Sequence, residues 1–236
     1  MNSPLILALD FSTEREVWTL VDQLEPGVCR LKVGKELFTA CGPSLVRALG
    51  ARGFDIFLDL KYHDIPHTVF QACRVAADLG VWMMDVHASG GRTMLEAARK
   101  ALEPYPQRPL LIAITILTSL QDSDLVTLGF GCSLTEAVQR MARLVVSSGL
   151  DGVVCSAQEA PLLRSQVAAS FSLVTPGIRL PDDDQGDQKR VVTPVTALRA
   201  GSDYLVVGRS ITRSEDPMKA LAQFNSLISG ARSTAV

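Results

Sequence analysis

Short apolar stretches rich in β-branched residues recur along the whole chain, and each has the length of a buried strand. They lie at residues 5–10, 29–34, 54–60, 82–87, 110–117, 151–155, 171–175 and 203–208. Stretches with a helical pattern separate them, at residues 12–24, 42–52, 66–79, 91–102, 134–148, 157–169 and 215–229. Ser12, Thr13 and Ser133 are suited to cap the helices that follow them. The chain therefore alternates between strand and helix from one end to the other.

This alternation predicts the fold class. Strict alternation with short connections requires parallel strands, and eight such units are the number at which a parallel sheet closes into a barrel. We therefore predict a single-domain α/β protein, a (β/α)8 TIM barrel over residues 1–236, with a frayed tail from about residue 230. A doubly wound open sheet is the second possibility. No strand is followed by a G-x-G-x-x-G or Walker sequence, so the motifs typical of nucleotide-binding open sheets are missing.

Composition narrows the class of partner. The formal net charge of -2 and the pI near 5.9 give no broad basic field, which argues against nucleic acid or an anionic membrane as the main partner. The five cysteines are odd in number and widely spaced, so we expect neither a disulfide framework nor a zinc site. We expect them to be buried apolar residues in a reducing cytoplasm. The chain start lacks a basic region, and no apolar run has the ~18 residues of a membrane span.

Charged residues stand at the carboxyl ends of several predicted strands, where the active site of such a barrel lies. In the third strand, Ile56, Leu58 and Leu60 share one face and are expected to point toward the helices. Asp59 and Lys61 then point into the barrel. The same alternation turns these further side chains inward: Asp10, Lys32, Asp85 and His87. A single such residue could equally form a structural ion pair, but burying the whole set is costly unless a ligand or a reaction uses it.

The last two strands are followed by sequences suited to a phosphate. The loops after strands seven and eight commonly hold phosphate in these barrels, and here they begin 176-PGIR-179 and 208-GRSI-211. Glycine lets the backbone approach an anion, and the forks of Arg179 and Arg209 add charge and bidentate geometry. The polar stretch from Leu180 to Arg190 has the composition of a solvated loop. Its attachment to Arg179 also allows a lid that closes over the phosphate and contributes Gln188.

The string D-L-K-Y-H-D-I-P-H-T, from Asp59 to Thr68, resembles the D-x-K-x-x-D-I-P-x-T signature of the orotidine 5′-phosphate decarboxylase family. The resemblance extends over nearly the whole chain. It continues in LALD, LKVG, DVHASGG, LTSL, TPGIR, DQKRVVTP and VGRSIT, which contain Asp10, Lys32, His87, Thr118, Arg179, Gln188, Gly208 and Arg209.

The resemblance implies roles for these residues and a reaction that forms UMP and CO2 from orotidine 5′-phosphate in pyrimidine synthesis. Lys61 would be the proton donor, flanked by Asp59 and Lys32. Asp64, Ile65 and Thr68 would reach the site of the neighbouring subunit of a homodimer. The substrate contacts implied for the remaining residues are Asp10 and Lys32 at the ribose, Thr118 near the pyrimidine, and Arg179, Gln188, Gly208 and Arg209 at the phosphate.

Charge chemistry fits these roles. Loss of CO2 leaves negative charge on C6 of the pyrimidine, which a fixed ammonium group would stabilise and then protonate. Asp59 and Asp64 would keep Lys61 charged, since nearby opposite charges favour the charged form. We therefore expect no metal and no organic cofactor.

Three other readings of the same residues stay open. Related barrels that act on keto-sugar phosphates share an Asp-x-Lys-x-x-Asp strand end but use Mg²⁺, and Lys32 is an awkward neighbour for a divalent ion. Schiff-base chemistry on Lys61 would need a neutral amine, which two flanking aspartates disfavour. The third is a binding barrel that senses a phosphorylated metabolite without turnover.

Overall fold

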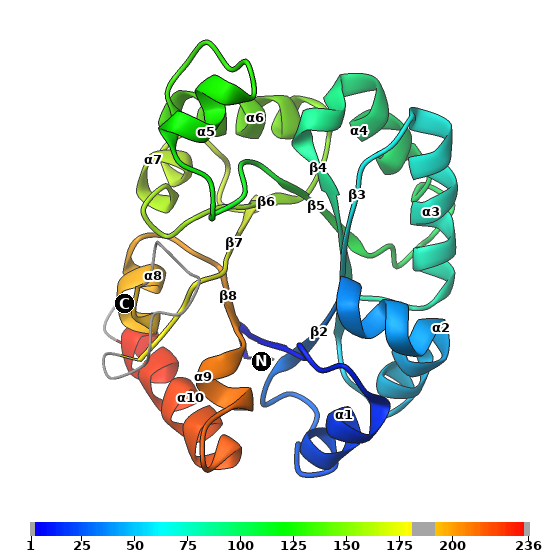
Figure 1. Ribbon diagram of the computed structural model, residues 1–236, viewed down its shortest axis with the longest axis vertical. Coiled ribbons are helices and arrows are strands. Elements are labelled where there is room, and N and C mark those ends of the chain that lie inside the picture. Colours follow the sequence, from blue (N-terminus) through cyan, green and yellow to red (C-terminus); the bar gives the residue numbers. More distant parts are fainter. Residues whose placement is uncertain (1–2, 181–191, 234–236) are drawn as a thin grey trace.

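The computed structural model describes residues 3–180 and 192–233 and contains a closed barrel of eight parallel strands (Figure 1). The strands pair in sequence order, and β1 also pairs with β8, so the predicted barrel is confirmed and the open sheet is excluded. The strands are β1 (Leu5–Ala8), β2 (Arg30–Gly34), β3 (Ile56–Tyr62), β4 (Met83–His87), β5 (Leu110–Ile114), β6 (Gly152–Val154), β7 (Ser172–Thr175) and β8 (Tyr204–Val207).

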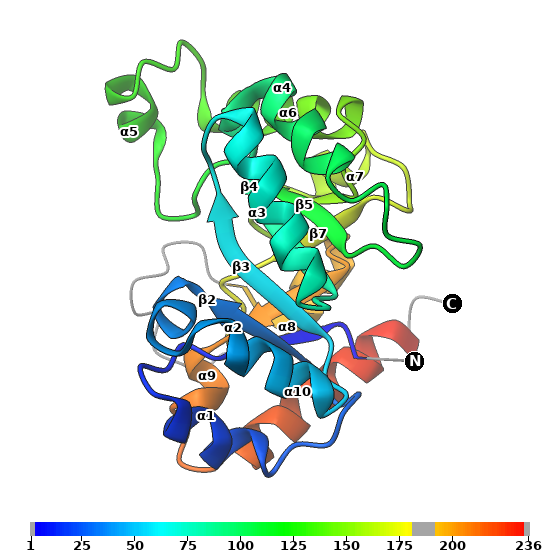
Figure 2. The same cartoon turned by 90° about the vertical axis from the view of Figure 1, so that its right-hand side faces the viewer.

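Helices surround the ring of strands (Figure 1). The longer ones are α1 (Glu14–Val21), α2 (Lys35–Ala51), α3 (Pro66–Asp78), α4 (Gly91–Lys100), α6 (Leu134–Ser147) and α10 (Pro217–Ser233). The shorter ones are η1 (Ala88–Gly90), α5 (Asp122–Thr127), α7 (Ala160–Arg164), α8 (Pro194–Arg199) and α9 (Arg209–Thr212). The sequence pattern did not predict η1, α5, α8 or α9, because elements this short carry little periodicity. Figure 2 shows α5 projecting away from the body of the barrel.

The predicted helix starts were partly right. Thr13 caps α1 and Ser133 caps α6, and each side chain accepts a hydrogen bond from the backbone N–H three residues ahead. Ser12 is not a cap; its hydroxyl donates to Glu36 instead. The helix predicted over 42–52 is the second part of α2, which already begins at Lys35. The two helical segments of α2 meet at a kink, where Gly42 adopts a positive φ of 68°.

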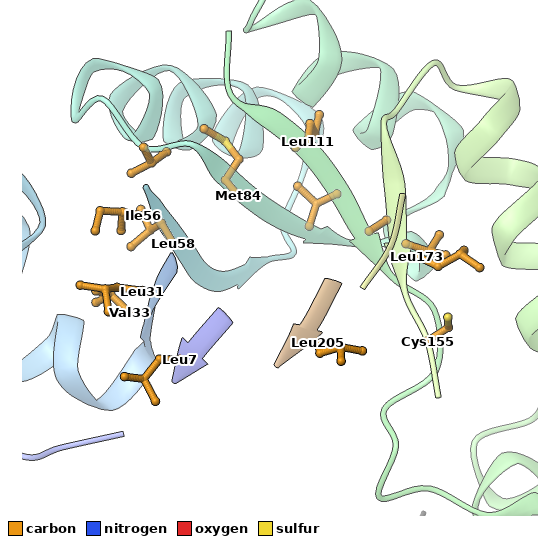
Figure 3. Close-up of a cluster of buried hydrophobic side chains, with 14 of the residues drawn as sticks. Leu7, Leu31, Val33, Ile56, Leu58, Met84, Leu111, Cys155, Leu173 and Leu205 are labelled. Atoms are coloured by element: carbon orange, nitrogen blue, oxygen red, sulfur yellow. The ribbon is translucent and has the colours of Figure 1, made fainter. Parts of the chain in front are cut away.

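Two apolar layers stabilise the barrel. Side chains on the outer face of the strands pack against the helices, as Figure 3 shows for Leu7, Leu31 and Leu58. A smaller cluster fills the interior: Ile6, Phe57, Met83, Ile112 and Val174. Each fully buried side chain of this size contributes about 1.5–3 kcal/mol relative to its exposed state.

The amino-terminal end of the barrel is closed by a stacked cation. The guanidinium carbon of Arg30, at the start of β2, lies 4.2 Å from the ring centroid of Trp82 and 5.2 Å from that of Tyr204. The two rings themselves meet edge to face at 5.1 Å. This packing leaves the opposite, carboxyl-terminal end of the strands as the open end of the barrel interior.

Other expectations from the sequence need adjustment. Residues 230–233 continue α10, with Ala231 buried, so the frayed tail predicted from about residue 230 was placed too early. All five cysteines are free, but only Cys29, Cys73 and Cys155 are buried. Within the described residues, no helix has the length and apolar character needed to cross a membrane.

Candidate active site

Four charged side chains from three adjacent strands form a chain of alternating sign. Lys32 Nζ lies 3.3 Å from Asp10 Oδ1 and 3.0 Å from Asp59 Oδ2. The other oxygen of Asp59 pairs with the ammonium group of Lys61. The order is therefore Asp10, Lys32, Asp59, Lys61. The inward direction that strand alternation predicted for these residues brings them together at the carboxyl ends of β1, β2 and β3.

The pKa values of the buried members show that the cluster keeps its charges. Burial opposes the charged form of Asp59, but the ammonium groups of Lys32 and Lys61 outweigh it and lower the pKa of this carboxyl well below its usual range. Burial would also lower the pKa of Lys32. Its contacts with Asp59 and Asp10 reverse that effect and raise the pKa above its ordinary value. At neutral pH, Lys32 is an ammonium group and Asp59 is a carboxylate.

Lys61 stands on a bulge of β3. Between Leu58 and Tyr62 the strand advances four residues while β4 advances only two, from Met84 to Val86. Lys61 has a φ of 52°, and it is the one residue other than glycine with a positive φ in the described parts of the chain. Asp59 and Lys61 both face the barrel interior, where they line one cavity.

Asp85 supports this bulge from β4. The sequence predicted that it points inward but gave it no role. It is fully buried, and its Oδ1 accepts a hydrogen bond of 2.7 Å from the backbone N–H of Lys61. Burial first, and then the nearby Asp59, raise the pKa of Asp85 well above its ordinary value. Sequence alone offered one signal for this residue, an acidic side chain in the middle of an otherwise apolar strand.

A cavity of about 260 Å³ opens above the charged cluster. It is lined by the cluster and by the loops after β7 and β8. The predicted site residues that line it are Asp10, Lys32, Asp59, Lys61, Thr118, Arg179, Gly208 and Arg209. Small apolar surfaces complete the wall, among them Ile116, Pro176 and Val206, which the sequence analysis did not single out. The cavity therefore combines an ion-pair end, an apolar wall and a pair of arginines.

Arg179, one of the two arginines that line the cavity, is held by contacts within the protein. Arg179 is buried, and its guanidinium group donates a hydrogen bond of 3.0 Å to the hydroxyl of Ser210. Ser210 was not predicted as a site residue, although it follows Arg209 in the string GRSI. A backbone bridge between Ile178 and Val192 holds the start of the loop that carries Arg179. Two arginines from different loops thus line the same cavity, and this arrangement is suited to bind a phosphate dianion.

Three predicted site residues among the described parts of the chain do not line this cavity. Asp64, Ile65 and Thr68 lie between β3 and the first turn of α3, where all three are exposed. The Asp64 carboxylate accepts a hydrogen bond from the backbone N–H of Ile65 rather than reaching Lys61. Gln188 lies outside the described residues. Within one chain, Lys61 is therefore paired with Asp59 and not with Asp64.

The acidic groups of the described residues do not form a metal cage. Over residues 3–180 and 192–233, no three His, Cys, Asp or Glu side chains are grouped so that they could hold a metal ion. At the cluster itself, the position between Asp10 and Asp59 is taken by the ammonium group of Lys32.

Comparison with known proteins agrees with this geometry. The family model described as "Orotidine 5'-phosphate decarboxylase / HUMPS family" matches residues 3–224. A protein of Laribacter hongkongensis named orotidine 5′-phosphate decarboxylase is 61% identical over 223 residues, covering 94% of this chain and 92% of that protein. One of the same name from Haemophilus influenzae is 57% identical over 226 residues, covering 95% and 98%.

Solved structures give the same result. The crystal structure of orotidine 5′-phosphate decarboxylase from Lactobacillus acidophilus superposes with a TM-score of 0.84 at 36% identity, over 96% of this chain and 99% of that one. An uncharacterized conserved protein from Geobacillus kaustophilus superposes with a TM-score of 0.82 at 41% identity, over 95% and 100%. By its motifs, its barrel and these matches, the chain belongs to the orotidine 5′-phosphate decarboxylase / HUMPS family.

Proposed function

We propose that this protein converts orotidine 5′-phosphate to UMP and CO2 in de novo pyrimidine biosynthesis, without a cofactor and with Lys61 as the proton donor. The observation that carries the proposal is the alternating chain Asp10, Lys32, Asp59 and Lys61 in one cavity with Arg179 and Arg209. The names of relatives that are 55–61% identical over nearly the full chain support it.

The chemistry needs a cation at the carbon that loses CO2. When the bond between C6 and the carboxylate breaks, its electron pair stays on C6, and a proton must replace the lost group. The Lys61 ammonium group would stabilise the developing charge and then transfer its proton to C6. Asp59 holds that ammonium group within the cavity, and Lys32 keeps Asp59 ionised. Solvent then returns a proton to Lys61.

The arginines would act at a distance from the reacting carbon. A phosphate held by Arg179 and Arg209, with the backbone of Gly208, would orient the pyrimidine toward Lys61. Asp10 and Lys32 are suited to bind the ribose hydroxyl groups, and Thr118 the pyrimidine ring. We assign Gln188 to the phosphate as well, from its position in the family motif.

The runner-up is a Mg²⁺-dependent reaction on a keto-sugar phosphate, and the observation against it is the contact of Lys32 with two carboxylates. A divalent ion at this position would compete with an ammonium group for the same oxygens. The two reactions therefore differ in their response to EDTA.

The test follows the fall in ultraviolet absorbance of orotidine 5′-phosphate with purified protein in EDTA. We expect turnover by the wild-type protein and a loss of about 10²–10⁴-fold in Lys61→Ala, the range for a positioned acid or base. Circular dichroism of the variant controls for folding. Turnover of orotidine 5′-phosphate that persists in EDTA would exclude the Mg²⁺-dependent alternative, and binding of UMP without turnover would favour a sensor.

We further propose that the functional unit is a homodimer in which Asp64, Ile65 and Thr68 serve the site of the neighbouring subunit. Their exposure and their separation from the cavity of their own chain support this proposal. Ile65, 66% exposed, is an apolar side chain that a second subunit would cover.

Five free cysteines support a location in the reducing cytoplasm.

A further inference from the structure

Asp85 is a buried acid that the proposed reaction does not use. It lies in the middle of β4, next to Ile112 of β5, and its exposed fraction is 0%. Among the described residues, no ion pair includes it. A carboxylate taken out of water without a paired cation costs several kcal/mol, so a carboxyl group at this position needs an explanation.

One oxygen of Asp85 controls the backbone that carries Lys61. Its Oδ1 accepts the N–H of Lys61 at 2.7 Å, at the point where β3 bulges and leaves the register of β4. Lys61 is held there at a φ of 52°. Left-handed geometry is unfavourable for a side-chain-bearing residue and persists only where its surroundings enforce it. The hydrogen bond to Asp85 is such a constraint.

The other oxygen of Asp85 is buried without a hydrogen-bond donor among the described residues. Oδ2 receives no hydrogen bond from any donor of the described residues, while the Asp85 and Asp59 carboxyl groups are within hydrogen-bonding reach of each other. Two ionised carboxylates cannot form such a bond because neither has a proton to donate. A proton on Asp85 supplies the donor and removes the repulsion between two like charges. The raised pKa of Asp85, caused first by burial and then by Asp59, agrees with this assignment.

We propose that Asp85 is a positioning residue: its Oδ1 fixes the backbone of Lys61 in the left-handed conformation, and its protonated carboxyl group donates a hydrogen bond to Asp59, the partner of the Lys61 ammonium group. A single neutral carboxyl group thereby binds both partners of the ion pair, the backbone of Lys61 and the carboxylate of Asp59. The inference rests on the proposed function, since the proton donor that it positions is Lys61.

Two variants of Asp85 separate its shape from its charge. Asp85→Asn keeps an acceptor for the Lys61 N–H and a donor toward Asp59, but it has no titrating proton. Asp85→Leu branches at the same carbon but has neither group. We expect Asn to retain most of the wild-type kcat and Leu to lower kcat about 100-fold, the effect of a small displacement of a catalytic group. KM should change little in both variants, because Asp85 does not line the cavity in which the arginines would hold the phosphate.

The pH profile of kcat tests the charge assignment. The titratable groups around Asp85 are Asp59, Lys61 and Tyr62 on β3 and Cys73 on α3. If Asp85 is already neutral, Asp85→Asn leaves the charges acting on these groups unchanged, and the profile should superpose on that of the wild type. An infrared difference spectrum of wild type minus Asp85→Asn should contain the carbonyl band of a protonated carboxyl group.

The outcomes separate this inference from the proposed function. An inactive, folded wild-type protein would overturn the function itself. An active wild type with an Asp85→Leu variant of normal kcat would overturn the role of Asp85 alone. Loss of activity in Asp85→Asn as severe as in Asp85→Leu, or the absence of the protonated carboxyl band, would refute the neutral acid. The Asn kinetics and the infrared spectrum decide the matter even if Asp85→Leu fails to fold.

Discussion

At the scale of a single residue, Lys61 combines an ion pair with an energetically unfavourable backbone conformation. Its side chain is paired with Asp59, and its backbone lies in a region that costs about 1–3 kcal/mol for a residue other than glycine. The surrounding contacts offset this strain, since Asp85 binds the backbone N–H and Lys32 fixes the other oxygen of Asp59. Placement of the ammonium group is therefore settled before any ligand arrives, which lowers the reorganisation needed during the reaction.

His87 is a second residue whose surroundings change its protonation. Burial first, and then the nearby groups His63, Lys35 and Lys61, lower its pKa from the ordinary 6.5 to about 4. The rings of His63 and His87 lie 5.3 Å apart. The unfolded chain takes up a proton at His87 near its ordinary pKa, whereas the folded protein does not until the pH is near 4. The free energy of unfolding should therefore fall as the pH drops through this window.

We predict that the free energy of unfolding of His87→Gln falls by about 1 kcal/mol less than that of the wild type as the pH drops through this window. The effect is this small because His87 is only half-buried and solvent screens its charge. The measurement is urea unfolding above and below the window at one protein concentration, comparing wild type and variant. His67 is exposed on α3 and provides the control, since His67→Gln should leave the pH dependence as it is. Equal pH dependence in wild type and His87→Gln would contradict the prediction.

At the scale of elements, β6 shows how closely the strands approach inside the barrel. A Cβ added to Gly152 would collide with the backbone oxygen of Ser172 on β7 and lie 2.8 Å from its Cβ. The Ile112 side chain on β5 would be 3.1 Å away. Neither neighbour can move freely, because the backbone of Ser172 belongs to the closed sheet. Glycine is needed here for space between strands.

Gly152→Ala should therefore lower the free energy of unfolding by about 1–3 kcal/mol, the usual cost of overpacking a core. The matched control is Gly50→Ala, because Gly50 lies in α2 with open space around its Cβ position and alanine favours a helix by up to about 1 kcal/mol. Thermal melting of both variants checks the pair. A melting temperature of Gly152→Ala at or above that of Gly50→Ala would be inconsistent with this packing.

At the scale of the whole molecule, Lys61 and the exposed start of α3 lie on one continuous stretch of chain. Lys61 lines the cavity, while Asp64, Ile65 and Thr68 are exposed and do not line it. The proposed homodimer would use both ends of this stretch at once, each in a different site. One site would then contain Lys61 from one subunit and Asp64 from the other.

This arrangement predicts complementation between two inactive variants. Lys61→Ala and Asp64→Ala should each lose most activity alone, because every site lacks one charged group. After the subunits are mixed and allowed to exchange, a heterodimer has one site with both groups intact, so part of the activity should return. Light scattering would report the dimer mass. Failure of the mixture to gain activity while the subunits demonstrably exchange would argue against shared sites.

The sequence by itself determined the barrel, the order of its strands and the family signature. These follow from local patterns: apolar runs of strand length, helical stretches between them, and side chains that alternate between two faces. Alternation was enough to turn Asp10, Lys32, Asp59 and Lys61 inward. The sequence pattern did not predict helices as short as α5 and α9, because four to six residues show no reliable helical period.

Only the tertiary structure decided how these groups meet. The bulge of β3, the left-handed backbone of Lys61 and its hydrogen bond to Asp85 depend on the register of β3 against β4. The contact of Arg179 with Ser210 and the separation of Asp64 from the cavity likewise join or divide segments that sequence spacing does not relate. The physical reason is the same in each case: closing the barrel fixes distances between strands, and those distances set both the charges and the strain of the site.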